Sequence, residues 1–539
     1  IKMNSIYING KISSLDNNNN FYEALAVKDG LIAALGRNTE ILKLKNENTK
    51  IIDLNGKLML PAFNDSHMHV VEYGENLIHA DLKGAKSIED IINTLKDFKE
   101  KSNVAAGEWI IGYGWNQDYF DVHRFPTRED LDKVSTENPI YITRACIHVA
   151  CVNTIVLKLA GINKNTKQVD GGVFEVDNYG QPNGVLREEA MSFVTSILPK
   201  KTKEDIKKSI LNVSKKLLKS GIASVQSDDF GNVKLYEDII NVYKELDEEG
   251  LLNIRVNQQC NMELSQLKDF ILKGYNLDKG SSHFKLGPLK IISDGSLGAR
   301  TAYMRNFYED DKTTKGISIY NKEILQELIS TAHDNNMSVA VHAIGDGAIE
   351  MAMNCIEVAI KNNPKKDTRH GIVHCQITDE MLLNRFKKLD LIAYIQPIFI
   401  HYDQHILEDR VGKELAKTSY NWKTLIDLGV VVCGSSDCPV ESFDLMNNLY
   451  CAVTRKDLNG YPEEGYNKSQ CLSIEEALKC FTIGGAYASF EENLKGTLEV
   501  GKFADMVVLD EDIYRCDKNK IKDININMTI VGGDIKYSL

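Results

Sequence analysis

Residues 58 to 70 read LMLPAFNDSHMHV, an apolar run that breaks at Pro61 and ends with His67 and His69. In an extended strand, side chains two residues apart point to the same face. Both imidazoles can therefore reach one ion at about 2 Å, the usual distance from zinc to a ring nitrogen. The stretch predicts a strand that ends at a metal site, and the fold must supply the remaining ligands.

Eight apolar runs alternate with amphipathic helical segments through the middle of the chain, which is typical of parallel βα units. They cover residues 58–65, 222–227, 253–259, 289–295, 338–343, 370–375, 391–397 and 430–437. Such units predict an α/β fold, a (β/α)8 TIM-like barrel whose functional groups lie at the carboxyl ends of its strands. The long interval after the first run predicts a large insertion after the first strand, at about 71–215.

The two ends of the chain have a different texture: short β-branched runs separated by Gly and Asn turns, as in SIYING and MTIVGGDIKYSL. This texture is typical of short antiparallel strands. We expect both termini to form one small β-sandwich, with residues 1–57 as its first part and 486–539 as its second. The barrel, with the insertion inside it, is then expected at 58–485.

The composition is that of an ordinary globular protein, with 43% hydrophobic and 26% charged residues and a net charge of -12. No stretch approaches the roughly 18 apolar residues of a membrane helix. The sequence also lacks a dense cluster of basic residues, so binding to nucleic acid or to an anionic membrane is not expected. Eleven scattered cysteines predict buried free thiols in a reducing compartment. With no secretory signal at the start, the cytoplasm is the expected location. A small-molecule substrate is the expected partner, and a homodimer is an assembly that the sequence leaves open.

Residues of metal-ligand type lie at the ends of several runs. Besides His67 and His69, they are His342 in the fifth run, His374 in the sixth and Asp437 after the eighth. Interior barrel positions are normally Val, Ile or Leu, so an imidazole or carboxylate there needs a partner that offsets its desolvation. A divalent metal is such a partner. Any one histidine could be an ordinary core or surface residue, but together they predict a metal site.

Lys290 lies inside the apolar fourth run, GPLKIISDG. One alternative is a buried lysine paired with an acid such as Asp294. In the other, burial lowers the pKa of the amine, and the neutral amine adds carbon dioxide to become a carbamate, whose two oxygens can bridge two metals. A carboxylate from the insertion, Glu188 or Glu189, could bridge instead.

This set of residues resembles that of the amidohydrolase superfamily: the HMH motif, the lysine of the fourth run, the histidines of the fifth and sixth runs and the aspartate after the eighth. Five sequence motifs are similar to those of its YtcJ-like branch, amidohydrolase family 3: GWNQ, GVLREEA, LKIISDGSLGARTA, VHAIGDGA and GSSDCPVESFD. The resemblance covers almost the whole chain. It implies the barrel together with a composite β-sandwich.

The resemblance also implies a ligand set. It assigns the more buried metal to His67, His69 and Asp437 and a second metal to His342 and His374, with Lys290 as a bridging carbamate. Whether this chain holds one ion or two stays open. Imidazole with carboxylate-type ligands suits Zn, and also Fe or Mn.

Such a site predicts a metal-dependent hydrolase that cleaves a C–N bond in an amide, cyclic amide or N-acyl compound. A divalent metal brings the pKa of a bound water from about 15.7 to about 7. Asp437 is then placed to act as general base and as acid towards the leaving nitrogen. The alternatives are a one-metal deaminase of an amino-heterocycle, with Lys290 unmodified, and a non-catalytic binding protein, which is disfavoured because no ligand position is missing.

Four residues are candidate substrate contacts. Arg300, in the Gly-rich loop after the fourth run, could clamp a substrate carboxylate bidentately or pair with an acid. Asp294 lies in the same loop. Trp115 could form an apolar lid or belong to the core of the insertion, and His148, also in the insertion, could line the pocket.

Overall fold

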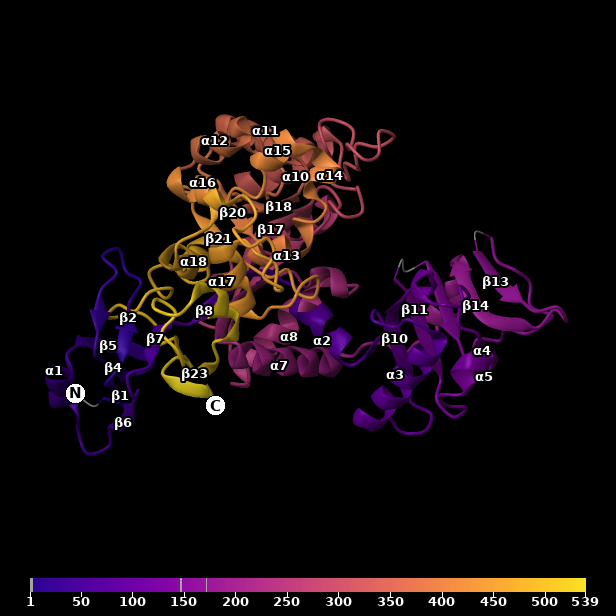
Figure 1. The fold of residues 1–539 in the computed structure, drawn as a ribbon, viewed down its shortest axis with the longest axis horizontal. Coiled ribbons are helices and arrows are strands. Elements are labelled where there is room, and N and C mark those ends of the chain that lie inside the picture. Colours follow the sequence, from indigo (N-terminus) through magenta and orange to yellow (C-terminus); the bar gives the residue numbers. More distant parts are fainter. Residues whose placement is uncertain (1–2, 146–147, 171) are drawn as a thin grey trace. The chain divides into compact units, whose positions relative to one another are not determined.

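The computed structural model describes residues 3–145, 148–170 and 172–539 (Figure 1). The chain forms two compact units, one of Ile1–Val71 with Lys207–Leu539 and one of Glu72–Ile206. Buried hydrophobic side chains form separate clusters in the two units. Each unit therefore has a core of its own.

Eight parallel strands form the centre of the larger unit, and their spatial order follows the sequence from β8 to β21. They are β8 (Phe63–Met68), β15 (Ile222–Ser227), β16 (Arg255–Asn261), β17 (Phe284–Ile292), β18 (Val339–Ala343), β19 (Gly371–His374), β20 (Ile392–Ile395) and β21 (Val432–Gly434). The first and last strands meet, since the Asp437 amide donates to the backbone oxygen of His67 at 2.8 Å. The prediction of an eight-stranded TIM-like barrel is confirmed.

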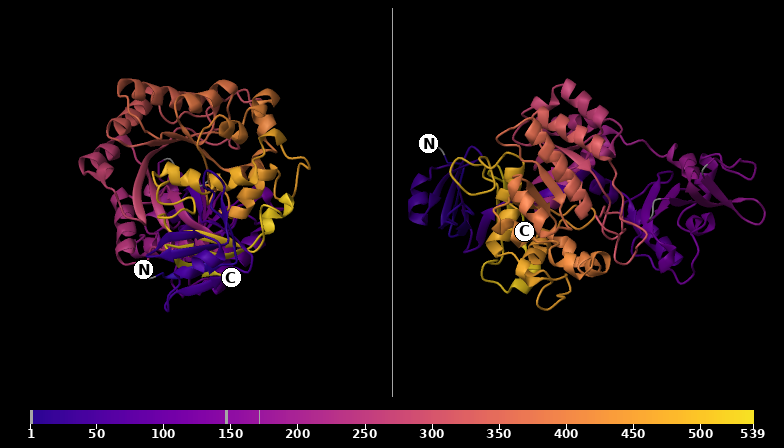
Figure 2. Two further views of the ribbon diagram at one scale, coloured as in Figure 1. Left: turned by 90° about the vertical axis from the view of Figure 1, so that its left-hand side faces the viewer. Right: turned by 90° about the horizontal axis from the view of Figure 1, so that it is seen from above.

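Helices cover the outside of these strands, as the left view of Figure 2 shows. The main ones are α7 (Lys203–Lys219), α8 (Tyr236–Glu248), α9 (Leu264–Leu272), α10 (Lys322–Asp334), α11 (Asp346–Asn362), α12 (Glu380–Lys388), α16 (Trp422–Asp427), α17 (Leu445–Thr454), α18 (Ile474–Cys480) and α19 (Ile483–Ala488). Because both faces of a parallel sheet are then buried, its strands appear in the sequence as continuous apolar runs. Polar caps begin several helices; the Asp379 carboxylate, for example, accepts from the Leu382 amide at 2.8 Å.

The first apolar run is divided between two sheets, which differs from the expected single barrel strand over 58–65. Its first half is β7 (Leu58–Pro61), which pairs with β2 (Lys11–Ser13) and β22 (Met506–Leu509). The partner changes between two consecutive amides: Ala62 donates to the oxygen of Asp505, and Phe63 donates to the oxygen of Gly221, both at 3.0 Å. The barrel strand β8 therefore begins at Phe63, and this places His67 near its carboxyl end.

Two mixed sheets built from both ends of the chain pack on one core. Their orders are β5-β4-β1-β6 and β24-β23-β22-β7-β2-β3. The strands not yet given are β1 (Ser5–Ile8), β3 (Phe21–Tyr22), β4 (Ala24–Lys28), β5 (Leu31–Gly36), β6 (Lys50–Asp53), β23 (Ile526–Val531) and β24 (Asp534–Ser538). Leu25, Met59 and Val508 share the core, so the amino-terminal and carboxy-terminal segments are buried together.

The expectation of antiparallel strands at the ends is wrong for two pairs. β1 is parallel to β6, and β2 is parallel to β7. Parallel neighbours need a crossover instead of a tight turn. The segment from β2 to β6, which includes α1 (Asn38–Ile41), supplies it. The division of the barrel and the sandwich at 57/58 and 485/486 stays a prediction.

The smaller unit is built on a six-stranded sheet in the order β13-β14-β12-β11-β10-β9. Its strands and main helices are β9 (Ala80–Asp81), β10 (Ile110–Trp115), β11 (Ile140–Arg144), β12 (Val149–Val152), β13 (Gly172–Val176), β14 (Pro182–Glu188), α3 (Ile88–Lys101), α4 (Arg128–Asp132) and α5 (Thr154–Leu159). Trp115 is fully buried in its core, and its ring lies 5.6 Å from that of Phe125. Of the two alternatives for Trp115, the core of the insertion describes where it lies.

The cysteines agree with the expectation of buried free thiols. All ten in the described part of the chain are free, and eight of them are buried. The eleventh, Cys146, lies outside the described residues. Across those same described residues, no helix combines the length and apolar character needed to cross a membrane.

Candidate metal centre

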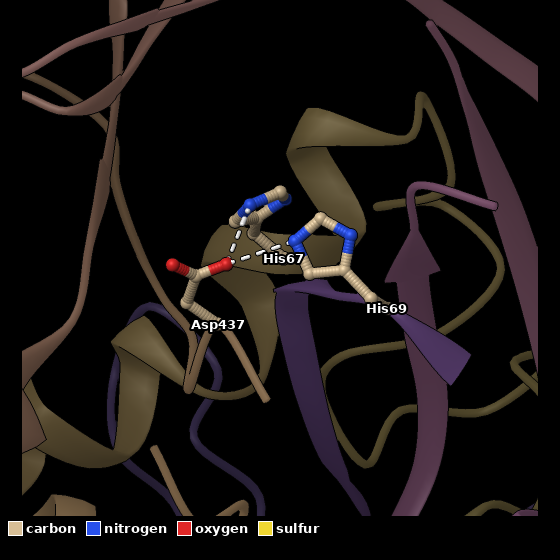
Figure 3. Close-up of side chains that lie close together, drawn as sticks. All are labelled: His67, His69 and Asp437. Atoms are coloured by element: carbon tan, nitrogen blue, oxygen red, sulfur yellow. Dashed lines mark hydrogen bonds and ion pairs between the residues drawn. The ribbon is translucent and has the colours of Figure 1, made fainter. Parts of the chain in front are cut away.

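Three side chains converge at the carboxyl end of the barrel: His67 in β8, His69 just after it and Asp437 after β21 (Figure 3). One ligand atom from each lies within 4.8 Å of the other two. Oδ1 of Asp437 is 3.0 Å from Nε2 of His67 and 3.0 Å from Nε2 of His69. Within the described ranges, no other group of three or more His, Cys, Asp or Glu side chains comes this close together.

The second ring nitrogen of each histidine faces a carbonyl oxygen. Nδ1 of His67 lies 2.7 Å from Oε1 of Gln259, and Nδ1 of His69 lies 3.0 Å from the backbone oxygen of Asp228. Because a carbonyl oxygen can only accept, each Nδ1 carries a proton, and in the neutral ring Nε2 keeps its lone pair. Metal-binding histidines are held in this way by an outer partner. The donor set therefore fits a divalent metal.

Burial and neighbouring charges shift the titration of these groups. Burial lowers the pKa of His67, and the charge of Lys290 lowers it further. Burial also lowers the pKa of His69, but the hydrogen bond and charge of Asp437 outweigh it and raise that pKa to about 9. Burial raises the pKa of Asp437, yet His67 and His69 outweigh it and hold the pKa well below its usual range. Asp437 is therefore an anion at neutral pH, as a cation ligand must be.

His374, the last residue of β19, lies beside this group. Its Nε2 is 3.9 Å from Oδ2 of Asp437, and its Nδ1 is 2.7 Å from Oε1 of Gln396. His374 therefore presents Nε2 to the centre in the same way as His67. The φ angles of His374 and Asp437, +84° and +57°, lie in the left-handed region, which costs a residue other than glycine about 1–2 kcal/mol. Such strain is concentrated at functional sites.

His342, in β18, is oriented differently. Its Nε2 is bonded to the backbone oxygen of Gly295 at 2.9 Å and lies 3.2 Å from Oδ1 of Asp294. Its ring centroid is 4.5 Å from that of His374. With Nε2 engaged, His342 has Nδ1 to offer to a ligand, and it lies outside the group formed by His67, His69 and Asp437.

The sequence profile of the amidohydrolase family matches residues 50–537. The chain belongs to the amidohydrolase family. It is 32% identical over 538 residues to YtcJ of Bacillus subtilis (strain 168), an amidohydrolase by name, and the match covers 99% of each chain.

Two other similar proteins match along almost the whole chain. A structure titled an uncharacterized metal-dependent hydrolase from Pyrococcus furiosus matches with a TM-score of 0.76 at 31% identity, over 95% of this chain and 100% of that one. N-substituted formamide deformylase of Arthrobacter pascens is 24% identical over 539 residues, 98% of this chain and 97% of that protein. Together with the His-His-Asp group, the family identifies the chain as a metal-dependent hydrolase.

Lys290 of this amidohydrolase lies in β17 next to the centre. It is 1% exposed, and its Nζ donates to Oδ2 of Asp228 at 3.2 Å. Burial raises the pKa of Asp228, but Lys290, His69 and His67 together outweigh it, so the pKa is lowered. The acid that pairs with Lys290 is therefore Asp228 and not Asp294. The carbamate stays a prediction.

Asp294 holds loops of the amidohydrolase barrel together. Its carboxylate accepts from the backbone amides of Tyr303 and Gly345, each at 2.9 Å, and from that of Ile344 at 3.1 Å. These bonds join the loop after β17 to the loop after β18. Asp294 therefore fixes the position of the loop that follows His342.

Arg300 and His148 have partners of their own. Arg300 donates to both carboxylate oxygens of Asp310, at 3.0 and 2.9 Å, so of its two alternatives the pairing with an acid describes its contacts. In the smaller unit, Nδ1 of the exposed His148 lies 2.9 Å from Oε2 of Glu188. Substrate contact by His148 and a metal bridge by Glu188 stay predictions.

Four polar residues of this amidohydrolase centre were not among the residues predicted from the sequence: Asp65, Asp228, Gln259 and Gln396. Two of them hold histidine rings through their side chains, and Asp228 holds His69 and Lys290. Asp65 accepts from the amide and hydroxyl of Ser436, which joins β8 to the loop after β21. Asp65 and Gln259 each end a buried apolar run, Asp228 follows one, and Gln396 lies within one. The signal that could find them is a polar residue in such a run.

Proposed function

We propose that this chain hydrolyses a C–N bond in an amide, cyclic amide or N-acyl compound, using one or two divalent metal ions. The observation that carries the proposal is the convergence of His67, His69 and Asp437 at the carboxyl end of an amidohydrolase-family barrel. The name of one full-length relative, N-substituted formamide deformylase, describes the removal of a formyl group from nitrogen. An N-substituted formamide is one member of the proposed substrate class.

The proposed ligand atoms are the carboxylate of Asp437, the amine of Lys290 and the histidine nitrogens that are not engaged by outer carbonyl partners. His67 and His69 would bind the first ion through Nε2, and Asp437 through a carboxylate oxygen. His374 through Nε2 and His342 through Nδ1 would serve a second ion, with Lys290 as a carbamate between the two. When bound, a divalent metal lowers the pKa of a water to about 7 and polarises a carbonyl oxygen. Zn fits these ligands best, and Fe or Mn also fit.

Asp437 is the proposed general base and acid. It is an anion at neutral pH; its Oδ1 contacts His67 and His69, and its Oδ2 lies 3.9 Å from Nε2 of His374. From that position it can take a proton from the attacking water and return it to the leaving nitrogen. Gln259 and the backbone of Asp228 keep the two rings in place while the proton moves.

The test combines metal analysis with a substrate screen. Elemental analysis of protein prepared without chelator counts ions per chain, and zinc-loaded protein is screened with N-acyl amino acids, N-formyl amines, cyclic ureides and aminoheterocycles. We expect a bound cation and release of amine or acid from one of the amide classes. A single ion with release of ammonia from an aminoheterocycle would favour the deaminase instead. No bound cation, and no activity on adding one, would overturn the proposal.

A separate measurement addresses Lys290. Intact-mass spectrometry of protein kept in bicarbonate would show the added mass of one carbon dioxide if the carbamate forms. Lys290→Ala is the control, because it removes the amine that reacts. An unmodified mass together with two ions per chain would contradict the bridge.

A further inference from the structure

A cavity of about 300 Å³ opens on the carboxyl-end face of the barrel. The loops after β17, β18, β19, β20 and β21 each contribute to its wall; Ser296, Ile344, Gln376, Phe399 and Val440 represent them in that order. This is the face on which barrel enzymes bind their substrates.

The cavity shares a wall with the metal centre. Phe399 lines it and stacks on the ring of His374, with 5.8 Å between the centroids. Ile344 and Gln376, which also line it, follow His342 and His374 by two residues. A molecule that reacts at the centre therefore has this cavity within reach for the rest of its structure.

Much of the wall is apolar, but the cavity has one acidic side. Leu297, Ile344, Phe399 and Val440 supply apolar surface. Asp403, at the end of α13 (Ile400–Asp403), supplies a carboxylate whose Oδ2 accepts from the Tyr420 hydroxyl at 2.5 Å. Burial raises the pKa of Asp403 to about 6, with the Tyr420 hydrogen bond opposing the rise. The carboxylate is therefore mostly ionised at neutral pH.

Gln376 lies beside Asp403, and the oxygen of its side-chain amide accepts no hydrogen bond from the described residues. Its Nε2 donates to the Tyr420 oxygen at 2.5 Å and faces Oδ2 of Asp403 at 3.3 Å. The residue is 3% exposed, and its Oε1 has no hydrogen-bond partner among the described residues. A buried carbonyl oxygen without a donor is costly, and most such groups have a partner. Gln376 thus offers an acceptor next to a negative charge.

The described residues that line the cavity include Asp403 and Glu441 but no lysine or arginine. Arg300 and Arg410, on neighbouring segments, both donate to Asp310. A substrate carboxylate in this cavity would be repelled by the Asp403 carboxylate, whereas an N–H donor would meet acceptors on Asp403 and Gln376.

We propose that this cavity selects substrates with an ammonium group, separated by an apolar spacer from the C–N bond that is cleaved, and that Asp403 and Gln376 bind this group. The inference rests on the proposed function and narrows it to amides of amine-bearing compounds. Under this proposal, Arg300 does not bind a substrate carboxylate.

Three matched formamides test the selection: N-formyl-1,5-diaminopentane, N-formylhexylamine and N-formyl-6-aminohexanoate. They share the scissile bond and a similar length, and end in an ammonium, a methyl and a carboxylate group. With zinc-loaded protein we expect kcat/KM to be about 10-fold higher for the ammonium compound than for the neutral one, as one charge-assisted hydrogen bond supplies. The carboxylate compound should be the poorest.

Asp403→Asn removes the charge but keeps an oxygen for the Tyr420 hydroxyl. It should lower kcat/KM for the ammonium compound about 10-fold, leave the neutral compound within about 2-fold and improve the carboxylate compound. Glu414→Gln is the matched control, because it also removes one negative charge, from a side chain that is 88% exposed and lies outside the cavity. Its preference should equal that of the unsubstituted protein.

The measured rates distinguish an error in the cavity assignment from an error in the proposed C–N hydrolase function. Hydrolysis of all three formamides at similar rates, or a preference that Asp403→Asn leaves unchanged, would overturn the inference and keep the C–N hydrolase. If no compound is hydrolysed, calorimetry with the same three still tests the cavity, since binding needs no turnover. Tighter binding of the ammonium compound that is lost in Asp403→Asn would then support the cavity assignment, and equal binding would overturn it.

Discussion

Replacing Gln259 with Leu should weaken metal binding without touching a proposed ligand. The side chain of Gln259 is fully buried in β16, and Leu has a similar size. Gln259 accepts from Nδ1 of His67 at 2.7 Å and donates to the backbone oxygen of Ser66 at 3.1 Å. The substitution removes both bonds, so the ring of His67 loses the partner that sets its orientation and tautomer.

The size of the effect follows from the position of that bond. Loss of an outer partner of a metal-binding histidine lowers metal affinity about 10- to 100-fold, or about 1.4 to 2.7 kcal/mol. Because the bond to His67 is short and fully buried, we expect the upper half of this range. The unpaired Nδ1 and the oxygen of Ser66 should also lower the free energy of unfolding by about 1–3 kcal/mol.

Competition with a chromophoric chelator measures the zinc affinity. Gln226→Leu is the matched control: Gln226 is 2% exposed in β15, and it bonds Asn64 and the backbone of Gly485, each at 2.7 Å. The control should lose stability but keep its zinc affinity. Gln396→Leu, which removes the matching bond at His374, should weaken the second ion. If Gln259→Leu and Gln226→Leu bind zinc equally, Nε2 of His67 is not a ligand.

Three further substitutions test other parts of the molecule. Asp437→Asn keeps an oxygen near both histidines but removes the base, so metal should be largely retained while turnover falls at least about 100-fold; substantial activity would refute its role. Asp505→Asn leaves the guanidinium of Arg255, 4% exposed and 2.7 Å from Asp505, without its counter-charge. This should destabilise the fold by about 3–5 kcal/mol, and an unchanged thermal midpoint would contradict it. Burial and His333 lower the pKa of His370 from 6.5 to about 3. Between these pH values the unfolded chain binds a proton that the folded chain refuses, so stability should fall by about 1.4 kcal/mol per pH unit on acidification. His370→Gln should show a shallower fall, and an identical one would refute the assignment.

Strand-end residues could be predicted because the barrel repeats one local pattern. A histidine or aspartate that interrupts an apolar run has few structural reasons to be there, and this signal found His67, His69 and Asp437. The same logic failed at 58–65, where the run is continuous in sequence but its hydrogen bonds change sheets between Ala62 and Phe63. Apolar character reports burial and not the identity of the neighbouring strand.

Partners distant in sequence could not be predicted in this way. Lys290 pairs with Asp228, 62 positions away, and not with the nearer Asp294. In a barrel, β15 and β17 both border β16, so their ends come close although no local pattern joins them. The acidic side of the cavity has the same origin, since Gln376 follows β19 and Asp403 lies beyond β20.

The sequence by itself determined the barrel, the presence of β-strands at both ends of the chain and the residue types at the metal centre. Periodicity and burial, on which these predictions rest, are properties of each short segment. Only the tertiary structure decided which ring nitrogen of His67 faces the metal centre, that Asp228 pairs with Lys290, and that Oε1 of Gln376 lacks a hydrogen-bond donor among the described residues. Those outcomes depend on atoms from separate strands meeting within about 3 Å, the range of a hydrogen bond. Closure of the barrel, and not any one segment, sets these distances.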